Sequence, residues 1–196
     1  PLEWVEIQAV LFFLPFPMLH GIMQTVRGVI NIKNYGGKWL MRRKDREVTD
    51  AAKIREIILS CDRCRLGFND DGEVYIVPLN FGYAEEDGSR VFYFHGAREG
   101  RKIDLIRKTG KAGFELDTHH EIVPGETACD HTALYQSVIG HGSICLLETI
   151  EDKKKAMQSI MLHNTGKDQW EIPEKTLMAM SLIQLTVQEL SCKEHL

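Results

Sequence analysis

The spacing of hydrophobic residues after position 40 predicts a chain of short strands with a few helices between them. Ile54, Ile57 and Ile58 lie at helical spacing behind Asp50, a residue that can cap a helix. Residues 50–60 are therefore expected to form an amphipathic helix. Two further helices are expected at residues 100–110 and 151–163.

Apolar and polar residues alternate in most of the remaining segments, and this alternation predicts an antiparallel sheet. The expected strands cover residues 65–68, 73–81, 90–95, 111–117, 133–147 and 183–188. Gly140 and Gly142 interrupt one long strand, so a bend or β-bulge is expected there. Strands dominate, and the predicted fold class is mainly β (α+β), an antiparallel β-barrel with a few peripheral helices.

Size and charge restrict the classes of function. The 196 residues suffice for one domain of ordinary size. Twenty-four Lys and Arg against 28 Asp and Glu give a net charge of -4, which disfavours nucleic acid as a partner. Five cysteines are too few for a disulfide-stapled secreted fold, so reduced thiols and a cytoplasmic location are expected.

The first 40 residues differ in composition from the rest. An apolar run at residues 9–19 is broken by Pro15 and Pro17, and it is shorter than the about 20 residues that span a bilayer. Acidic Glu3 and Glu6 stand where a secretion signal carries basic residues, so neither a signal nor a membrane segment is expected. Our hypothesis is that residues 1–40 are an extension that need not be native, preceding a working domain at 41–196. The alternative is a native arm that packs on a partner subunit.

Several common catalytic motifs are missing from the sequence. There is no GxGxxG opening a βαβ unit, no Walker loop and no GxSxG. Cys61 and Cys64 form a single CxxC pair, which we interpret as core cysteines because a structural zinc needs four ligands. The histidines, acids and cysteine at residues 119–121, 129–131 and 141 fit no ligand spacing, so no metal is predicted, although a transition metal stays an alternative.

The most informative segment joins a strand that ends at His95 to the helix expected at 100–110. Gly96 and Gly100 shape the turn, and Arg101 and Lys102 open the helix. Cations are unfavourable at the positive end of a helix dipole, unless an anion binds there. The segment therefore predicts a phosphate site, with a solvated basic surface as the alternative.

A flat ligand is suggested by the strand expected at 73–81. Pro78 lacks a backbone donor and is tolerated only at a sheet edge or a bulge. An edge strand offers unpaired backbone groups to a planar ring. A planar ligand with a phosphate tail could be flavin mononucleotide (FMN).

Five separated segments carry a family resemblance. Residues 41–46, 75–83, 93–97, 100–104 and 137–140 resemble, in this order, the nitroimidazole-resistance branch of the pyridoxamine 5'-phosphate oxidase-like flavoproteins. The resemblance covers nearly all of residues 41–196 and none of 1–40. It implies a split β-barrel homodimer that binds FMN at the subunit interface.

The resemblance also implies site residues. Val77, Pro78, Leu79 and Asn80 would line the isoalloxazine, His95, Gly96 and Ala97 would lie beside the ring and ribityl chain, Arg101 and Lys102 would hold the phosphate, and Ser137 and Val138 would complete the pocket. The chain departs from the family pattern at Gln136, where relatives usually carry Arg, and at His141, where they usually carry Phe. The first departure removes a cation from the expected pocket.

The expected activity is an FMN-dependent oxidoreductase that reduces a small acceptor such as a nitroaromatic, a quinone or another flavin. His95 is the candidate proton donor, since an imidazole titrates near neutral pH, but it could equally well only hydrogen-bond the ribityl chain or backbone. Because no nicotinamide fold is present, NAD(P)H would dock transiently on the flavin, or a partner reductase would supply electrons.

Two other functions stay open at this point. The chain could be a non-catalytic carrier of FMN or of another planar cofactor such as haem. It could also oxidise pyridoxamine phosphate itself, which needs a second phosphate site, but the sequence shows no obvious second cluster of cations.

Overall fold

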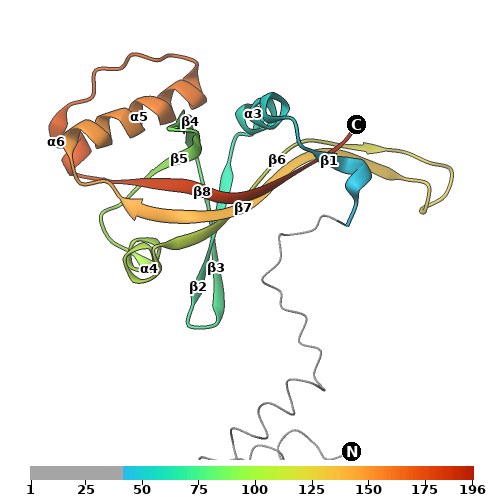
Figure 1. The fold of residues 1–196 in the computed structure, drawn as a ribbon, viewed down its shortest axis with the longest axis horizontal. Coiled ribbons are helices and arrows are strands. Elements are labelled where there is room, and N and C mark those ends of the chain that lie inside the picture. Colours follow the sequence, from blue (N-terminus) through green and yellow to red (C-terminus); the bar gives the residue numbers. More distant parts are fainter. Residues whose placement is uncertain (1–41) are drawn as a thin grey trace, which may run out of the picture. The chain divides into compact units, whose positions relative to one another are not determined.

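The computed structural model describes residues 42–196, so the predictions for residues 1–40 lie outside the described residues. Its elements are η1 (Lys44–Arg46), β1 (Glu47–Val48), α3 (Ala51–Ser60), β2 (Cys64–Asp70), β3 (Glu73–Leu79), β4 (Gly82–Glu86), β5 (Ser89–Gly96), α4 (Arg101–Thr109), β6 (Lys111–Val123), β7 (Thr132–Leu146), α5 (Ile150–Thr165), α6 (Glu174–Met178) and β8 (Ser181–His195). Figure 1 shows α3 and α5 on one side of the ribbon formed by β7 and β8, and α4 with the β2–β3 hairpin on the other. Across this part of the chain no helix has the length and apolar composition needed to cross a bilayer.

The strands form one antiparallel sheet in the order β3-β2-β6-β7-β8-β5-β4, and β1 pairs with β8 outside this path. This confirms the prediction of a mainly β fold with peripheral helices. The strand β3 lies at an edge of the sheet, which confirms the prediction made from Pro78. Proline has no backbone N–H to donate, and an edge strand has a neighbour on one side only.

The bend predicted at Gly140 and Gly142 is present as a register shift of β7 against β8 between His141 and Gly142. Both positions require glycine, since a Cβ at residue 140 would overlap the carbonyl oxygen of Glu189 and one at residue 142 that of Thr186. The bulge lets the long strand curve across the sheet.

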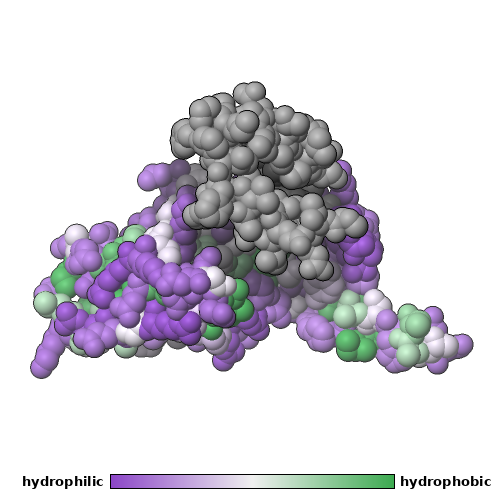
Figure 2. Space-filling model, turned by 90° about the horizontal axis from the view of Figure 1, so that it is seen from below, coloured by the Kyte–Doolittle hydropathy of each residue, from purple (hydrophilic) through white to green (hydrophobic). Residues whose placement is uncertain are grey.

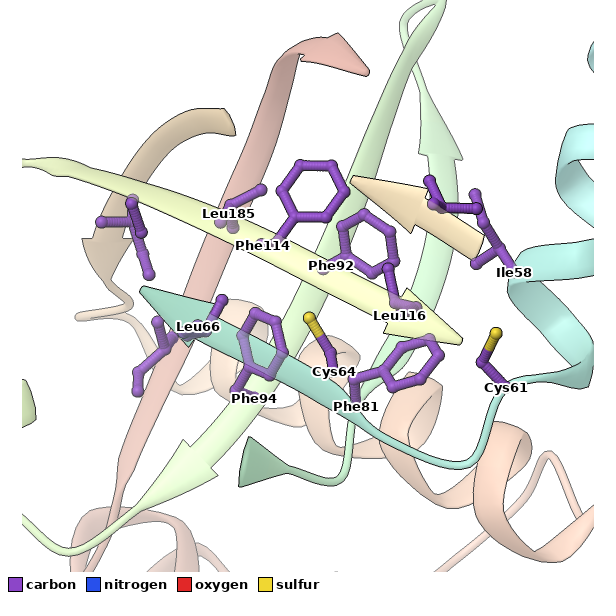
Figure 3. Packing of buried hydrophobic residues seen from close by; sticks show 14 of the residues in the cluster. Ile58, Cys61, Cys64, Leu66, Phe81, Phe92, Phe94, Phe114, Leu116 and Leu185 are labelled. Carbon is purple, nitrogen blue, oxygen red and sulfur yellow. The ribbon is translucent and has the colours of Figure 1, made fainter. Parts of the chain in front are cut away.

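The main core lies inside the curved sheet and is rich in aromatic rings. Phe81, Phe92, Phe94 and Phe114 are fully or almost fully buried there, as the close view in Figure 3 shows for these labelled side chains. Phe92 contacts Phe114 with ring centroids 5.1 Å apart. The apolar stripes of α3 and α4 cover this core, which explains the helical spacing seen in the sequence.

A second, smaller core lies between α5 and the sheet. Val91 and Tyr93 of β5 point into it, whereas Phe92 and Phe94 point into the main core. Four consecutive buried residues in β5 therefore reflect a strand covered on both faces.

Some elements differ from the prediction. The strands β6 and β8 extend beyond residues 111–117 and 183–188, and η1, β1, β4 and α6 were not predicted. The sequence of β4 is Gly-Tyr-Ala-Glu-Glu, which has little strand propensity; its pairing with β5 through the turn at Asp87 and Gly88 forms it.

The added length of β6, paired with the first part of β7, makes a hairpin arm that projects from the sheet (Figure 1). Ile122 and Val123 are exposed on this arm, and hydrophobic atoms are visible on the projection at the right of Figure 2. The prediction ended β6 at residue 117 because residues 117–121 are all polar. A strand segment with both faces exposed shows no alternation of apolar and polar residues, so the sequence pattern did not indicate the rest of the strand.

Candidate functional site

The predicted phosphate corner forms where β5 ends and α4 begins. Gly100 caps α4 with a φ of 121°, a conformation that favours glycine, and its carbonyl accepts hydrogen bonds from the N–H groups of Ile103 and Asp104. No side chain caps the N-terminus of this helix. The first turn of α4 thus presents backbone N–H groups that an anion can accept from.

Lys102 is one of two unpaired cations at this corner. Its side chain is half-buried, whereas that of Arg98 in the preceding turn is exposed, and neither forms an ion pair with an acidic residue in the described part of the chain. The ammonium lies against Gly96, where a Cβ would stand 2.6 Å from Lys102 Nζ. Burial lowers the pKa of Lys102. An ammonium held in a partly desolvated place without a counter-ion favours binding of an anion.

His95 lies near Lys102 at the end of β5 and is exposed to solvent. Partial burial, and secondly the charge of Lys102, lower the pKa of His95 below the usual 6.5. The imidazole is therefore mainly neutral at pH 7 in the absence of a ligand, with one nitrogen as donor and one as acceptor.

Arg101 is held in a different way from Lys102. Its Nε donates to the carboxylate of Asp70 over 2.8 Å, and its guanidinium carbon lies 4.8 Å from the ring centroid of Tyr75. At the other end of α4, Lys108 donates to Asp71 over 2.7 Å. The β2–β3 hairpin therefore contacts α4 at both ends through neighbouring acidic residues.

The four predicted ring-lining residues of β3 and its end do not share a face. Val77 and Leu79 pack against the main core, whereas Pro78 and Asn80 are exposed. The Asn80 amide donates to Asn164 of α5 over 2.7 Å, and the Asn164 amide donates to the carbonyl of Phe81 over 3.0 Å. α5 thus fixes the end of the edge strand.

Ser137 and Val138 do not join this corner within one chain. The Val138 side chain is fully buried in the main core, and Ser137 lies on the other face of β7. His95 pairs with Leu182 of β8, near Leu146 of β7, so Ser137 lies nine residues away along β7, or up to about 30 Å. The single chain therefore brings together His95, Gly96, Ala97, Arg101 and Lys102, and leaves Ser137 and Val138 apart.

Gln136, which replaces the expected cation, is buried and donates to Glu194. Its amide is thus engaged inside the fold. His141 is exposed on the outer face of β7.

Sequence reasoning missed Asp70, Tyr75 and Asn164 as contributors to the site. Asp70 lies 31 positions before Arg101, and Asn164 lies 84 positions after Asn80. No spacing rule connects residues so far apart. One signal for the Asp70 contact was present in the sequence. Two acidic residues, Asp70 and Asp71, follow one another after the first predicted strand, and basic residues stand at both ends of the helix expected at 100–110.

The cysteines match the interpretation of core residues. Cys61 and Cys64 are buried, and burial raises the pKa of the Cys61 thiol to about 12. Within residues 42–196 no three His, Cys, Asp or Glu side chains are grouped to hold a metal ion.

The fold and corner define a class of protein: a small antiparallel barrel with an uncapped helix start beside an unpaired lysine. Residues 50–194 match the family model described as pyridoxamine 5'-phosphate oxidase, and the chain belongs to this family. A comparison with curated protein sequences gives no match.

Solved structures agree with a split-barrel fold. A candidate 5-nitroimidazole antibiotic resistance protein from Bacteroides thetaiotaomicron is 28% identical, with a TM-score of 0.65, covering 75% of this chain and 85% of its own. The flavocytochrome Anf3 from Azotobacter vinelandii is 17% identical (TM-score 0.66; 80% and 72% covered), and an FAD and heme binding protein from Mycobacterium smegmatis is 14% identical (TM-score 0.63; 76% and 73% covered). The predicted fold class and family are thereby confirmed.

Proposed function

We propose that this protein binds FMN and is an oxidoreductase that reduces a small acceptor such as a nitroimidazole or another nitroaromatic. The observation that carries the proposal is the half-buried Lys102, which has no acidic partner in the described chain, at the uncapped start of α4. In a member of this family, such a corner fits the phosphate of a flavin nucleotide.

Each group of residues has a task in this proposal. Lys102 and the terminal nitrogens of Arg101 hold the phosphate with the N–H groups of α4, and Gly96 and Ala97 lie beside the ribityl chain. Pro78, Asn80 and the open backbone edge of β3 meet the ring, with Val77 and Leu79 supporting it from the core side. FMN supplies the electron-transfer chemistry when bound, and the chain supplies orientation and electrostatics.

His95 is the proposed proton donor at the ring. Its lowered pKa disfavours the imidazolium in the ligand-free chain, and a bound phosphate beside Lys102 would raise that pKa and so favour the imidazolium, the form that can donate a proton. The electron donor is NAD(P)H, which docks on the flavin, or a partner reductase. The nitroimidazole acceptor is supported by the 28% identity to the Bacteroides protein.

A homodimer completes the site in this proposal. Ser137 is remote from His95 in one chain, so a second copy must bring it to the pocket. The outer sheet face offers a surface for that copy, since Val74 and Ile76 are 75% and 60% exposed and share this face with Ile139. The free thiols of all five cysteines support a cytoplasmic location.

The test begins with the purified protein and added FMN. Flavin absorbance should be retained after gel filtration, and Arg101→Ala with Lys102→Ala should weaken FMN binding by about tenfold or more, since two charge-assisted contacts are lost. The control is Arg107→Ala, because Arg107 is an exposed cation at the far end of the same helix. A colourless protein that takes up no FMN would contradict the proposal.

Turnover is tested separately from binding. The bound flavin should bleach with NAD(P)H and recover its absorbance when a nitroimidazole is added. A flavin that binds but never cycles with a reductant and acceptor would make the protein a carrier. Haem uptake instead of FMN would be visible in the same spectra.

A further inference from the structure

Several acidic residues lie near the start of α4, among them Glu99 and Asp104, but within the described chain only Asp70 pairs with a cation of the predicted phosphate corner. Asp70, at the end of β2, accepts a hydrogen bond from Arg101 Nε over 2.8 Å, in the first turn of α4. A carboxylate at a phosphate site is unexpected, because it repels the ligand. Its presence therefore needs a reason.

Stability is a weak reason. The Arg101 side chain is 54% exposed and that of Asp70 is 26% exposed, and exposed ion pairs contribute little to folding because water screens them. The same two elements are already joined by Lys108 and Asp71 at the other end of α4.

The geometry of the contact gives a better reason. Asp70 engages Nε, the innermost donor of the guanidinium, while the plane rests near Tyr75. This leaves the two terminal nitrogens, which carry four of the five N–H donors. A guanidinium held at Nε and supported by a ring can present these donors to a second acceptor as a fork.

Lys102, the neighbouring cation, has no acidic partner in the described chain to hold it as Asp70 holds Arg101. Its ammonium folds back against Gly96. Arg101 is longer and more exposed than Lys102, so an unheld Arg101 would spread over many conformers in the open solvent. Ordering it in advance lowers the entropy cost of binding.

We propose that Asp70 is a positioning residue of the phosphate site, which holds Arg101 by its Nε so that the terminal nitrogens of Arg101 receive the phosphate of the flavin nucleotide. This inference rests on the proposed binding of FMN. It assigns to Asp70 a role in selecting a phosphorylated flavin over one without phosphate.

The experiment compares FMN with riboflavin, which has the same ring and ribityl chain but no phosphate. Dissociation constants for both are measured for the full chain and for Asp70→Ala, Asp70→Asn and Asp71→Ala. Asp71→Ala is the matched control, because it removes the neighbouring ion pair to the same helix and leaves Arg101 untouched. Thermal unfolding of each variant checks that it is folded.

Asp70→Ala should weaken FMN binding about tenfold and leave riboflavin binding unchanged. Asp70→Asn should restore most of the FMN affinity, since the amide oxygen can still accept from Nε. Asp71→Ala should bind as the unchanged chain does. In an Arg101→Ala background, Asp70→Ala should have no further effect.

Three results with the variants would overturn the role of Asp70: FMN affinity that stays equal or rises in Asp70→Ala, an equal loss for FMN and riboflavin, or an equal loss in Asp71→Ala. Failure of the proposed function looks different. In that case the unchanged chain would bind neither flavin, whereas equal binding of FMN and riboflavin by the unchanged chain would overturn the role of Asp70 alone.

Discussion

The Lys102 ammonium occupies the space that a side chain at position 96 would need, because a Cβ on Gly96 would stand 2.6 Å from Lys102 Nζ. The far end of a lysine is flexible and can move away at little cost. Position 96 therefore controls where Lys102 places its charge, without being needed for the fold.

Gly96→Ala should weaken FMN binding by about tenfold while changing the free energy of unfolding by less than about 1 kcal/mol. The physical reason is displacement of the ammonium, so the effect should depend on the lysine. In a double-mutant cycle, Gly96→Ala combined with Lys102→Met should bind no more weakly than Lys102→Met alone. Additive losses in the cycle would show that Gly96 acts in another way. FMN titration and denaturant unfolding supply the two measurements.

Gly140 of β7 should respond in the opposite manner, with a loss of stability. Gly140→Ala places a Cβ against the backbone oxygen of Glu189 and the ring of Phe114, and backbone cannot move aside as a lysine tip can. We expect a loss of about 1–3 kcal/mol or more in the free energy of unfolding, measured with urea.

The matched control for this prediction is Gly67→Ala. A Cβ at Gly67 meets nothing within 4 Å, so its stability should stay within about 0.5 kcal/mol of the unchanged chain. Equal stability of the two variants at one protein concentration would contradict the close approach of β7 and β8 at Gly140.

Local patterns in the sequence predicted the parts of the fold that local physics decides. The cap at Asp50, the edge position of Pro78 and the bulge at Gly140 and Gly142 all follow from single residues and their neighbours, and the structure confirms them. The strand β4 did not follow, because its five residues have little strand propensity and β5 supplies their hydrogen bonds.

The site was predictable only in the segment that is continuous in sequence. His95, Gly96, Ala97, Arg101 and Lys102 lie within eight positions and meet at one corner. The Asp70 contact with Arg101 and the Asn164 contact with Asn80 depend on how the hairpin and α5 dock, which no local pattern encodes. The same is true of the separation of Ser137 from His95.

The protonation of His95 is the next testable quantity. Burial and the nearby Lys102 lower its pKa, so the folded chain binds fewer protons than the unfolded chain between that lowered value and about 6.5. The contribution to stability is therefore complete above pH 6.5 and is lost as the pH falls toward the folded pKa. An NMR titration of the imidazole signals, with His95→Gln to assign the resonance, should show a midpoint below 6.5.

Lys102→Met should move the His95 midpoint upward, since it removes the neighbouring positive charge. Added inorganic phosphate should also raise the midpoint in the unchanged chain, because a bound anion favours the imidazolium. Lys108→Met is the control, because Lys108 pairs with Asp71 at the far end of α4. A His95 midpoint at or above 6.5 in the ligand-free chain would contradict this description of the corner.

Of the five thiols, two should react with a thiol reagent in the folded chain and three should not. Cys129 and Cys145 are exposed, whereas Cys61, Cys64 and Cys192 are buried. Burial raises the pKa of Cys61 to about 12 and that of Cys192 to about 11, and a thiol that stays protonated is a poor nucleophile. An aromatic disulfide reagent at pH 8 should therefore modify two thiols per folded chain and five after unfolding.

The two exposed thiols should react at different rates. Partial burial raises the pKa of Cys145, so Cys129→Ser should remove the faster of the two phases of the modification reaction. Rapid modification of Cys61 or Cys64 in the folded chain would show that the CxxC segment opens to solvent, and would remove the reason to treat these two residues as core residues.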